Sequence, residues 1–243
     1  MRIRSFLILL AIAGSVQAAD SISVGHRVIP DEGEAAVKPM AWRFRLLERA
    51  QDLFEKRAAE QAPGAALTFR LPKVDPAQAG NQVEIVGADH HVPLPMASNI
   101  TFALLRHTLA EDSDTMVVVN RNFPKGEFNH PLVQVRSPGL PDGVRRMGDL
   151  RLACAAQMAM AKEEGFTVRA ALAAASLFGV NVCDKLEATK VEEPSGTYDT
   201  VTIEDGSRRL VLPAKEKNQP ALGDKGWSDD ARISYTLNGR GVQ

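Results

Sequence analysis

Three consecutive side chains, Asp89, His90 and His91, are of the types best suited to bind a metal ion. Imidazole nitrogens and carboxylate oxygens are common ligands of zinc and other transition metals. Neighbouring residues of an extended strand point to opposite faces, so the two histidines share one metal only where the chain bends. We therefore favour a polar turn between Gly87 and Pro93 with no bound metal. Asp89 and His90 are the candidate ligands if a metal does bind.

A metal-dependent hydrolase is the alternative function that the Asp89 and His90 region allows. Asp-His-His resembles, over three residues alone, a motif of a family of phosphoesterases, which also needs upstream carboxylates that cannot be placed in this chain. His107 and His130 are the further ligands that such a site would recruit. Both are isolated in the sequence, and no His-Glu-x-x-His motif occurs.

Serine nucleophiles find little support in the sequence. The chain has no Gly-x-Ser-x-Gly elbow and no Ser-x-x-Lys motif. Ser228 precedes Asp229 and Asp230, but this stretch is more simply a loop leading to the last strand. The sequence identifies no catalytic residue, predicts no cofactor, and leaves open whether the protein is an enzyme.

The two cysteines, Cys154 and Cys183, are too far apart for a Cys-x-x-Cys redox pair. We expect them to form a disulfide; the alternative is two unpaired, buried thiols. The enclosed loop has about 30 residues, for which the chain-entropy model gives a stabilisation of roughly 3–4 kcal/mol.

A pair of antiparallel helices, residues 147–186, is expected to carry the disulfide. The run from Asp149 to Glu164 is rich in residues that favour helices, with Asp149 as the N-cap. A second helix is expected over 167–178. The first run also shows an apolar period of two, which favours a strand. Its alanine content and its length decide for a helix.

Residues 1–18 have the features of a secretory signal peptide. Arg2 and Arg4 precede the apolar run 6–13, and Ala18 ends a Val-Gln-Ala sequence that fits the cleavage rule. The apolar run is too short to anchor the chain in a bilayer, and no later stretch is long enough. We expect a periplasmic protein, with secretion to the medium as the alternative. An exported protein with two cysteines suits an oxidising compartment.

The charge and composition argue against nucleic-acid binding. The formal net charge is −1, with no basic face evident, and aromatic residues make up only 5% of the chain. A stacking platform for single strands needs more aromatic side chains, and a duplex-binding surface needs an excess of positive charge.

Other elements follow from periodicity and turn signals. Residues 19–39 are expected to form an extended or disordered arm, and 40–61 an amphipathic helix. Asp205 and Gly206 predict a type I′ turn in a β-hairpin. Alternating or β-branched runs predict strands over 66–71, 82–86, 99–104, 115–119, 132–135, 200–203, 209–212 and 232–237.

Two polar regions are considered as surface sites. The loop 122–129 carries Phe123 and Phe128 and, together with 138–143, is a candidate binding edge, because loops on a β-scaffold often carry function. Arg145 and Arg146 near Asp149 are interpreted as a solvated salt link.

Together these patterns predict an α+β protein. One antiparallel sheet or small sandwich over 66–136 would be completed by the strands of 198–237, with the first helix and the disulfide-linked helical pair packed on it in one domain, 40–243. The function that we favour is an exported, non-catalytic binding or accessory protein of the cell envelope, with an envelope protein or cell-wall component as its partner. A purely structural role is a further possibility.

Overall fold

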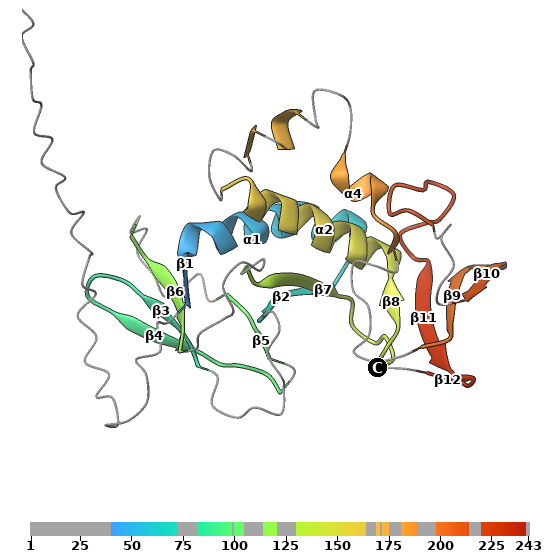
Figure 1. Ribbon diagram of the computed structural model, residues 1–243, viewed down its shortest axis with the longest axis horizontal. Coiled ribbons are helices and arrows are strands. Elements are labelled where there is room, and N and C mark those ends of the chain that lie inside the picture. The colour runs from blue at the N-terminus through green and yellow to red at the C-terminus, as the bar shows by residue number, and fades with distance from the viewer. Residues whose placement is uncertain are drawn as a thin grey trace, which may run out of the picture. The chain divides into compact units, whose positions relative to one another are not determined.

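The computed structural model describes residues 40–71, 82–98, 100–104, 114–120, 130–163, 169–170, 172–174, 181–188, 198–213 and 220–241 (Figure 1). All of them fall within one unit, residues 37–243. The expected signal peptide (1–18), the arm (19–39), His107, Phe123 and Phe128 lie outside the described residues. The described part combines helices with antiparallel sheets, which confirms the α+β class.

The strands form three separate sheets, each of them antiparallel. One contains, in spatial order, β1 (Met40–Arg43), β6 (Met116–Val119), β3 (Val83–Val86) and β4 (His91–Leu94). The second contains β5 (Thr101–Phe102), β2 (Ala66–Arg70) and β7 (Leu132–Arg136). The third contains β10 (Arg208–Pro213), β9 (Thr200–Asp205), β11 (Arg232–Leu237) and β12 (Arg240–Gly241), with β8 (Arg145–Arg146) also paired to β11.

The expectation that the C-terminal strands complete the first sheet is therefore wrong. In the described part of the chain, β9, β10 and β11 pair with one another and with the two short strands β8 and β12. Short polar strands such as β8 and β12 carry no periodic signal, so the sequence does not reveal the pairing that sets this sheet apart.

Three described helices accompany the sheets: α1 (Phe44–Gln61), α2 (Met147–Ala161) and the short α4 (Val182–Lys185). The first begins four residues later than expected, because Met40–Arg43 pairs along β6 as a strand. Trp42 is buried while Arg43 beside it is exposed, as the two faces of a strand require. Trp42 also lies four residues before Leu46, and this spacing suggested a helix.

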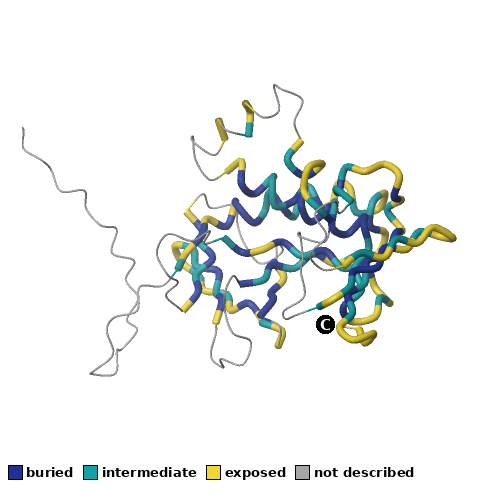
Figure 2. The backbone as a smooth tube through the Cα atoms, turned by 45° about the vertical axis from the view of Figure 1, so that its right-hand side comes forward, coloured by how far each residue is buried: buried dark blue, intermediate teal, exposed yellow. Residues whose placement is uncertain are grey.

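The helix α2 contributes buried residues to two hydrophobic clusters. Figure 2 shows the buried and exposed segments of the backbone. One cluster gathers around α1 and the first two sheets, and the other around the third sheet. Burial on more than one side is typical of a helix in a core position. The face toward the first cluster carries Leu152, Ala153, Ala156 and Met160, and the face toward the second carries Met147, Leu150 and Cys154.

Two hairpins use different two-residue turns. Between β9 and β10 the turn residues are Gly206 and Ser207, and only Gly206 has a positive φ, of 61°. This is the pattern of a type II′ turn and corrects the expected type I′ turn at Asp205 and Gly206. Between β11 and β12, Asn238 and Gly239 have φ of 51° and 74°, as in a type I′ turn.

Candidate functional site

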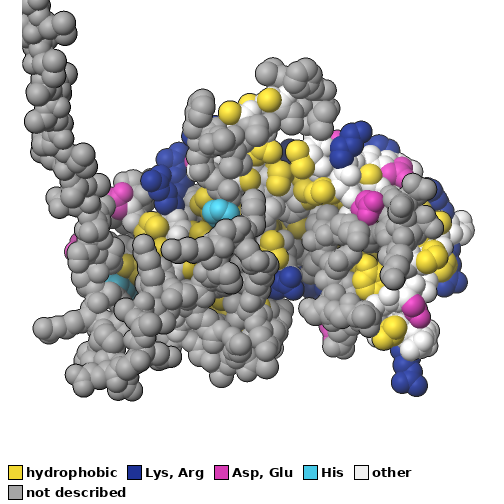
Figure 3. Space-filling view, viewed as in Figure 1, with side chains coloured by type: hydrophobic (Ala, Val, Ile, Leu, Met, Phe, Trp, Pro, Cys, Tyr) yellow, Lys and Arg dark blue, Asp and Glu magenta, His cyan; other side chains and the backbone are white. Residues whose placement is uncertain are grey.

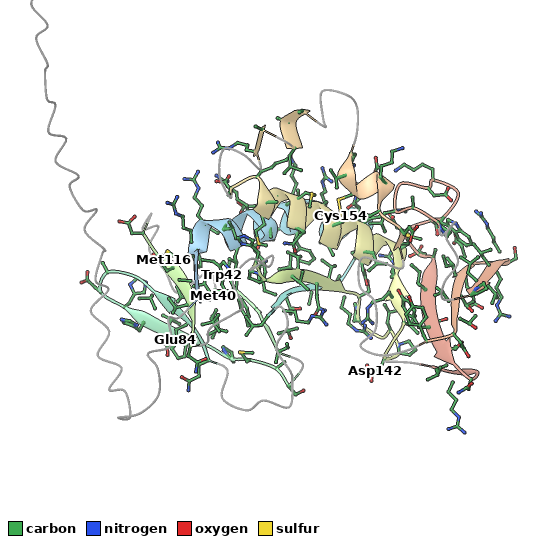
Figure 4. All side chains as sticks on the ribbon, viewed as in Figure 1. Met40, Trp42, Glu84, Met116, Asp142 and Cys154 are labelled. Carbon is green, nitrogen blue, oxygen red and sulfur yellow. A yellow bond between two sulfur atoms is a disulfide. The ribbon has the colours of Figure 1, made fainter. Side chains whose placement is uncertain are left out.

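The disulfide joins Cys154 of α2 to Cys183 of α4, which confirms the expected pairing (Figure 4). Both residues are buried in the second cluster. Asn181 caps α4, because its side-chain oxygen accepts a hydrogen bond from the Cys183 backbone N–H at 3.2 Å. The partner of α2 is thus a short helix. Of the second long helix expected over 167–178, only 169–170 and 172–174 are described, and they are helical.

A groove of about 610 Å³ lies beside this disulfide. One wall is a stripe of α1 residues, Leu53, Arg57 and Gln61, and the other is a stripe of α2 that includes Ala155 and Met158. Spacings of three and four residues place such side chains on one side of a helix. The ends are closed by residues from α4 and from the loop before β11, among them Val182, Cys183, Asp184, Leu222 and Lys225.

The groove lining combines apolar side chains with positive charges. Its apolar residues are Leu53, Ala155, Met158, Leu172, Val182 and Leu222, and its cations are Arg57, Arg151, Lys162 and Lys225. Asp184 is the one carboxylate among the lining residues that the structure describes. On the face drawn in Figure 3, hydrophobic side chains gather over α2, and Lys and Arg side chains lie beside α4.

Arg151 holds the loop that closes one end of the groove. Its Nε donates to the Leu222 carbonyl oxygen at 2.7 Å, and its Nη1 donates to Asp229 Oδ1 at 2.6 Å. Its Nη2 donates to the carbonyl oxygens of Asp224 and Trp227 at 2.9 and 3.0 Å. The charge of Arg151 is therefore used inside the fold, in contrast to the exposed cations of Arg57, Lys162 and Lys225, which have no ion pair with another described residue.

Asp149 is the centre of a buried polar cluster at the start of α2. Its carboxylate accepts hydrogen bonds from the Ser137 backbone N–H at 2.8 Å and from the Ser137 hydroxyl at 2.7 Å. It is not the N-cap as expected; Arg146 occupies that position without a side-chain cap. Asp149 lies in the first helical turn, where a negative charge is favourable.

The salt link expected between Arg146 and Asp149 is present, but it is buried and not solvated. The Arg146 side chain is only 12% exposed. Its Nη1 donates to the Gln61 carbonyl oxygen at 2.6 Å and lies 3.7 Å from Asp149, while its Nη2 donates to Asp230 at 2.7 Å. The guanidinium therefore joins the end of α1 to the start of α2. This link helps to position Gln61 at the end of the groove.

The loop before β11 is fixed to the hairpin of the third sheet. Ser228 donates through its hydroxyl and its backbone N–H to the two oxygens of Asp205, both at 2.7 Å. The Arg208 guanidinium lies 3.8 Å from the centroid of the buried Trp227 ring, a cation–π contact. Ser228 thus has a structural role, in agreement with its interpretation as part of a loop.

The hydrogen bonds of Asp205 are expected to make the stability of the fold sensitive to acid. The Ser228 hydroxyl and backbone N–H, in that order, lower the pKa of the Asp205 carboxyl below its ordinary value. A carboxyl whose pKa is lower in the folded than in the unfolded protein stabilises the fold above about pH 4, and this contribution is lost as the pH falls through the folded-state pKa. The thermal midpoint of Asp205→Asn is therefore expected to fall less steeply below pH 4 than that of the wild type.

The control for this pH series is Asp142→Asn, because Asp142 is 79% exposed and only loosely paired with Arg136 at 3.8 Å. Its curve of thermal midpoint against pH is expected to run parallel to that of the wild type between pH 7 and 3. An Asp205→Asn curve that also ran parallel to the wild type would contradict the role of Asp205.

The candidate metal ligands Asp89 and His90 lie in the four-residue loop between β3 and β4. The expected polar turn is shorter than predicted, since it ends at His90 and His91 begins β4. Asp89 is exposed, and His90 lies so close to Gly87 that a side chain there would clash with its ring. Within the described ranges, no three His, Cys, Asp or Glu residues gather to hold a metal. His91 instead faces Glu84 across the hairpin at 3.9 Å.

A second hollow, of about 410 Å³, lies over β2 and β7. Among its described lining residues, only Arg136 is charged, and its guanidinium donates to the carbonyl oxygens of Leu140, Pro141 and Val144. Because the Arg136 guanidinium already makes these hydrogen bonds, it is less available to a ligand than the exposed cations of the groove beside the disulfide.

The sequence interpretation did not identify the groove, although one signal for it was present. Leu53, Arg57 and Gln61 are spaced four residues apart, as are Arg151 and Ala155. This spacing places each set on one side of its helix, and whether the two sets meet depends on how α1 packs against α2. In the described part of the chain, no helix has the length and hydropathy of a membrane span. Comparison of the chain with protein-family models, curated proteins and solved structures finds no match.

Proposed function

We propose that the protein is an exported, non-catalytic binding protein of the cell envelope, and that the groove beside the disulfide is its binding site. The observation that carries the proposal is the groove itself: an open, partly apolar hollow whose walls come from α1 and α2 and whose end is tied down by the bond from Cys154 to Cys183. Concave, partly apolar sites with a few placed polar groups are the usual form of ligand pockets.

The side-chain chemistry of the groove supports binding over catalysis. Arg57, Lys162 and Lys225 are exposed cations that line the groove, so they attract and orient negative charge. The apolar floor contributes by removing ligand surface from water. The metal-dependent hydrolase with Asp89 and His90 stays a prediction, which metal analysis of the purified protein would test.

Export is supported by the disulfide together with the N-terminal sequence. Disulfides persist mainly in oxidising compartments, and residues 1–18 fit the signal-peptide pattern. The test is to express the full chain with a C-terminal tag and fractionate the cells. Expected results are a protein that begins at Ala19, lies in the envelope fraction, and reacts with a thiol-specific reagent only after reduction. A cytoplasmic protein that retains Met1 and has two reactive thiols would contradict export.

Binding is tested in the same cells by chemical crosslinking and recovery of the tagged protein. A saturable envelope component that is retained by the wild type, and lost when Arg57 and Lys162 are both changed to Glu, would support the proposal. The control is Lys56→Glu, an exposed change on the same helix outside the groove. Equal recovery from all three proteins would contradict the assignment of the groove.

A further inference from the structure

We infer that the ligand of this groove is a small amphipathic organic anion, with an apolar body of medium length and a carboxylate or phosphate head. The inference rests on the proposed function and names the chemistry of its ligand. It is drawn from the size of the groove, the arrangement of its charges, its apolar floor and one buried polar atom.

The size of the groove favours a small molecule over a folded partner. Its volume of about 610 Å³ lies within the range of roughly 300–1,000 Å³ that is usual for sites of small ligands. The walls are two helices with a third, disulfide-linked helix at the end, so the hollow is built from regular elements. Walls made of helices favour a preformed site, which loses little entropy on ligand binding.

The charges of the groove select for an anion. Arg57, Lys162 and Lys225 come from three different elements and converge on one hollow, and none forms an ion pair with another described residue. Asp184 opposes them with a single negative charge, and Arg151 is already paired with Asp229. Among the described lining residues, three cations without a described ion-pair partner therefore face one carboxylate, and such an excess of positive charge raises the local concentration of anions.

The apolar floor selects for a ligand with a hydrocarbon body. Met158, Val182 and Leu222 come from α2, α4 and the closing loop and line the same hollow, together with Leu53 of α1. Burial of apolar ligand surface favours binding and offsets part of the cost of association. A simple inorganic anion would pair with the cations but would bury no apolar surface. The groove therefore suits an anion that also has an apolar part.

Gln61 lines the groove and has one buried polar atom that a ligand group would reach when the side chain turns toward the hollow. The side-chain Oε1 of Gln61 is buried and has no hydrogen-bond partner among the described residues. A buried polar atom left unpaired destabilises the fold. Gln61 lines the groove and is anchored through its backbone by Arg146. The amide has both a donor and an acceptor end, so it can bind a hydroxyl, a protonated acid or, after a flip, a carboxylate oxygen.

The test is calorimetric titration of the purified, disulfide-bonded protein with sodium decanoate. We expect saturable binding to one site, weakened by salt because charges contribute. Decyl phosphate is expected to bind as well, whereas acetate lacks the apolar body and decyltrimethylammonium carries the opposite charge, so both should bind at least about tenfold more weakly, a difference of 1.4 kcal/mol or more. Equal binding of the cationic amphiphile would overturn the inference.

Charge-reversal variants assign the binding to the groove. Arg57→Glu with Lys162→Glu is expected to weaken decanoate binding by about tenfold or more, while Lys56→Glu should stay within about twofold of the wild type. All three residues are exposed, so the thermal midpoints should remain close to that of the wild type. Decanoate binding that is unchanged in the double variant would overturn the groove as its site.

Co-sedimentation with phosphatidylglycerol vesicles tests whether the protein binds a lipid surface instead of a free amphiphile. Co-sedimentation with vesicles in the absence of decanoate binding would contradict a small-molecule ligand. If the wild type binds no decanoate but still retains an envelope component through the groove in cells, the ligand class is wrong and the proposed function stands. If neither is observed, both fail.

Discussion

Changing Asp149 to Ala is expected to lower the free energy of unfolding by about 3–5 kcal/mol, the usual cost of removing one partner from a buried ionic cluster. Asp149 is only 1% exposed, and its two oxygens accept both hydrogen bonds from Ser137. Without the carboxylate, the buried Ser137 N–H and hydroxyl lose their acceptor, and Arg146 loses one of its two negative neighbours. Urea unfolding followed by circular dichroism measures the loss.

The matched control is Asp142→Ala, because Asp142 is an exposed aspartate (labelled in Figure 4) that lies 3.8 Å from Arg136. Exposed pairs contribute about 0–1 kcal/mol, so this variant should resemble the wild type. Ser137→Ala should fall between the two, since it removes the hydroxyl and keeps the backbone N–H. Similar losses for Asp149→Ala and Asp142→Ala would show that the buried cluster does not stabilise the fold as described.

Removal of the disulfide is expected to cost about 3–4 kcal/mol. The two cysteines are 29 residues apart, and the chain-entropy model gives a value in this range for a loop of that length. The double variant Cys154→Ala/Cys183→Ala tests this by urea unfolding against the oxidised wild type. Wild-type protein in a reducing agent is the control and should unfold close to the double variant. A shift of less than about 1 kcal/mol on reduction would contradict the stabilising role.

Loss of the disulfide is also expected to weaken ligand binding in the groove. Cys183 lines the groove, and α4 has only four residues, too few to be stable as an isolated helix. Loss of the covalent link should therefore let α4 move away from α2 and weaken ligand binding under conditions in which the rest of the protein is still folded. Oxidised and reduced protein with equal affinity for decanoate would show that the link does not position the groove.

The secondary structure was largely predictable where the pattern was strong. The strand over 232–237 was predicted with its observed bounds, because Ile233 and Tyr235 alternate with polar residues. The helix α2 was predicted despite a competing period of two. Both signals arise from one helix, since Leu150 and Cys154 face the second cluster while Leu152 and Met160 face the first.

The errors arose where tertiary pairing decides the conformation. Met40–Arg43 became a strand because β6 lies beside it, and a window of the sequence does not contain that neighbour. The pairing of β8 with β11 brings together residues far apart in the chain. The turn at Asn238 and Gly239 could have been predicted, because Asn-Gly is a strong hairpin signal, but the short strand after it has no pattern of its own.

The candidate site was the least predictable part. The disulfide could be predicted from the number of cysteines and the expected export. The groove depends on the packing of α1 against α2 and on the Arg151 bonds that hold the closing loop. The role of Asp149 was also not predictable from its neighbours in the sequence. Its place at the start of the helical run suggested an N-cap, whereas its hydrogen-bond partner, Ser137, lies twelve residues away.

The most direct test of the groove as a binding site is photocrosslinking in living cells. A photoreactive amino acid is placed at Leu53, which lines the groove, or at Ala59, which is exposed and does not line it. Helical spacing puts the two positions on different sides of α1. We predict a discrete crosslinked product from position 53, removed by Arg57→Glu with Lys162→Glu, and none from position 59. No product from position 53, or the same products from both positions, would contradict a binding site in the groove.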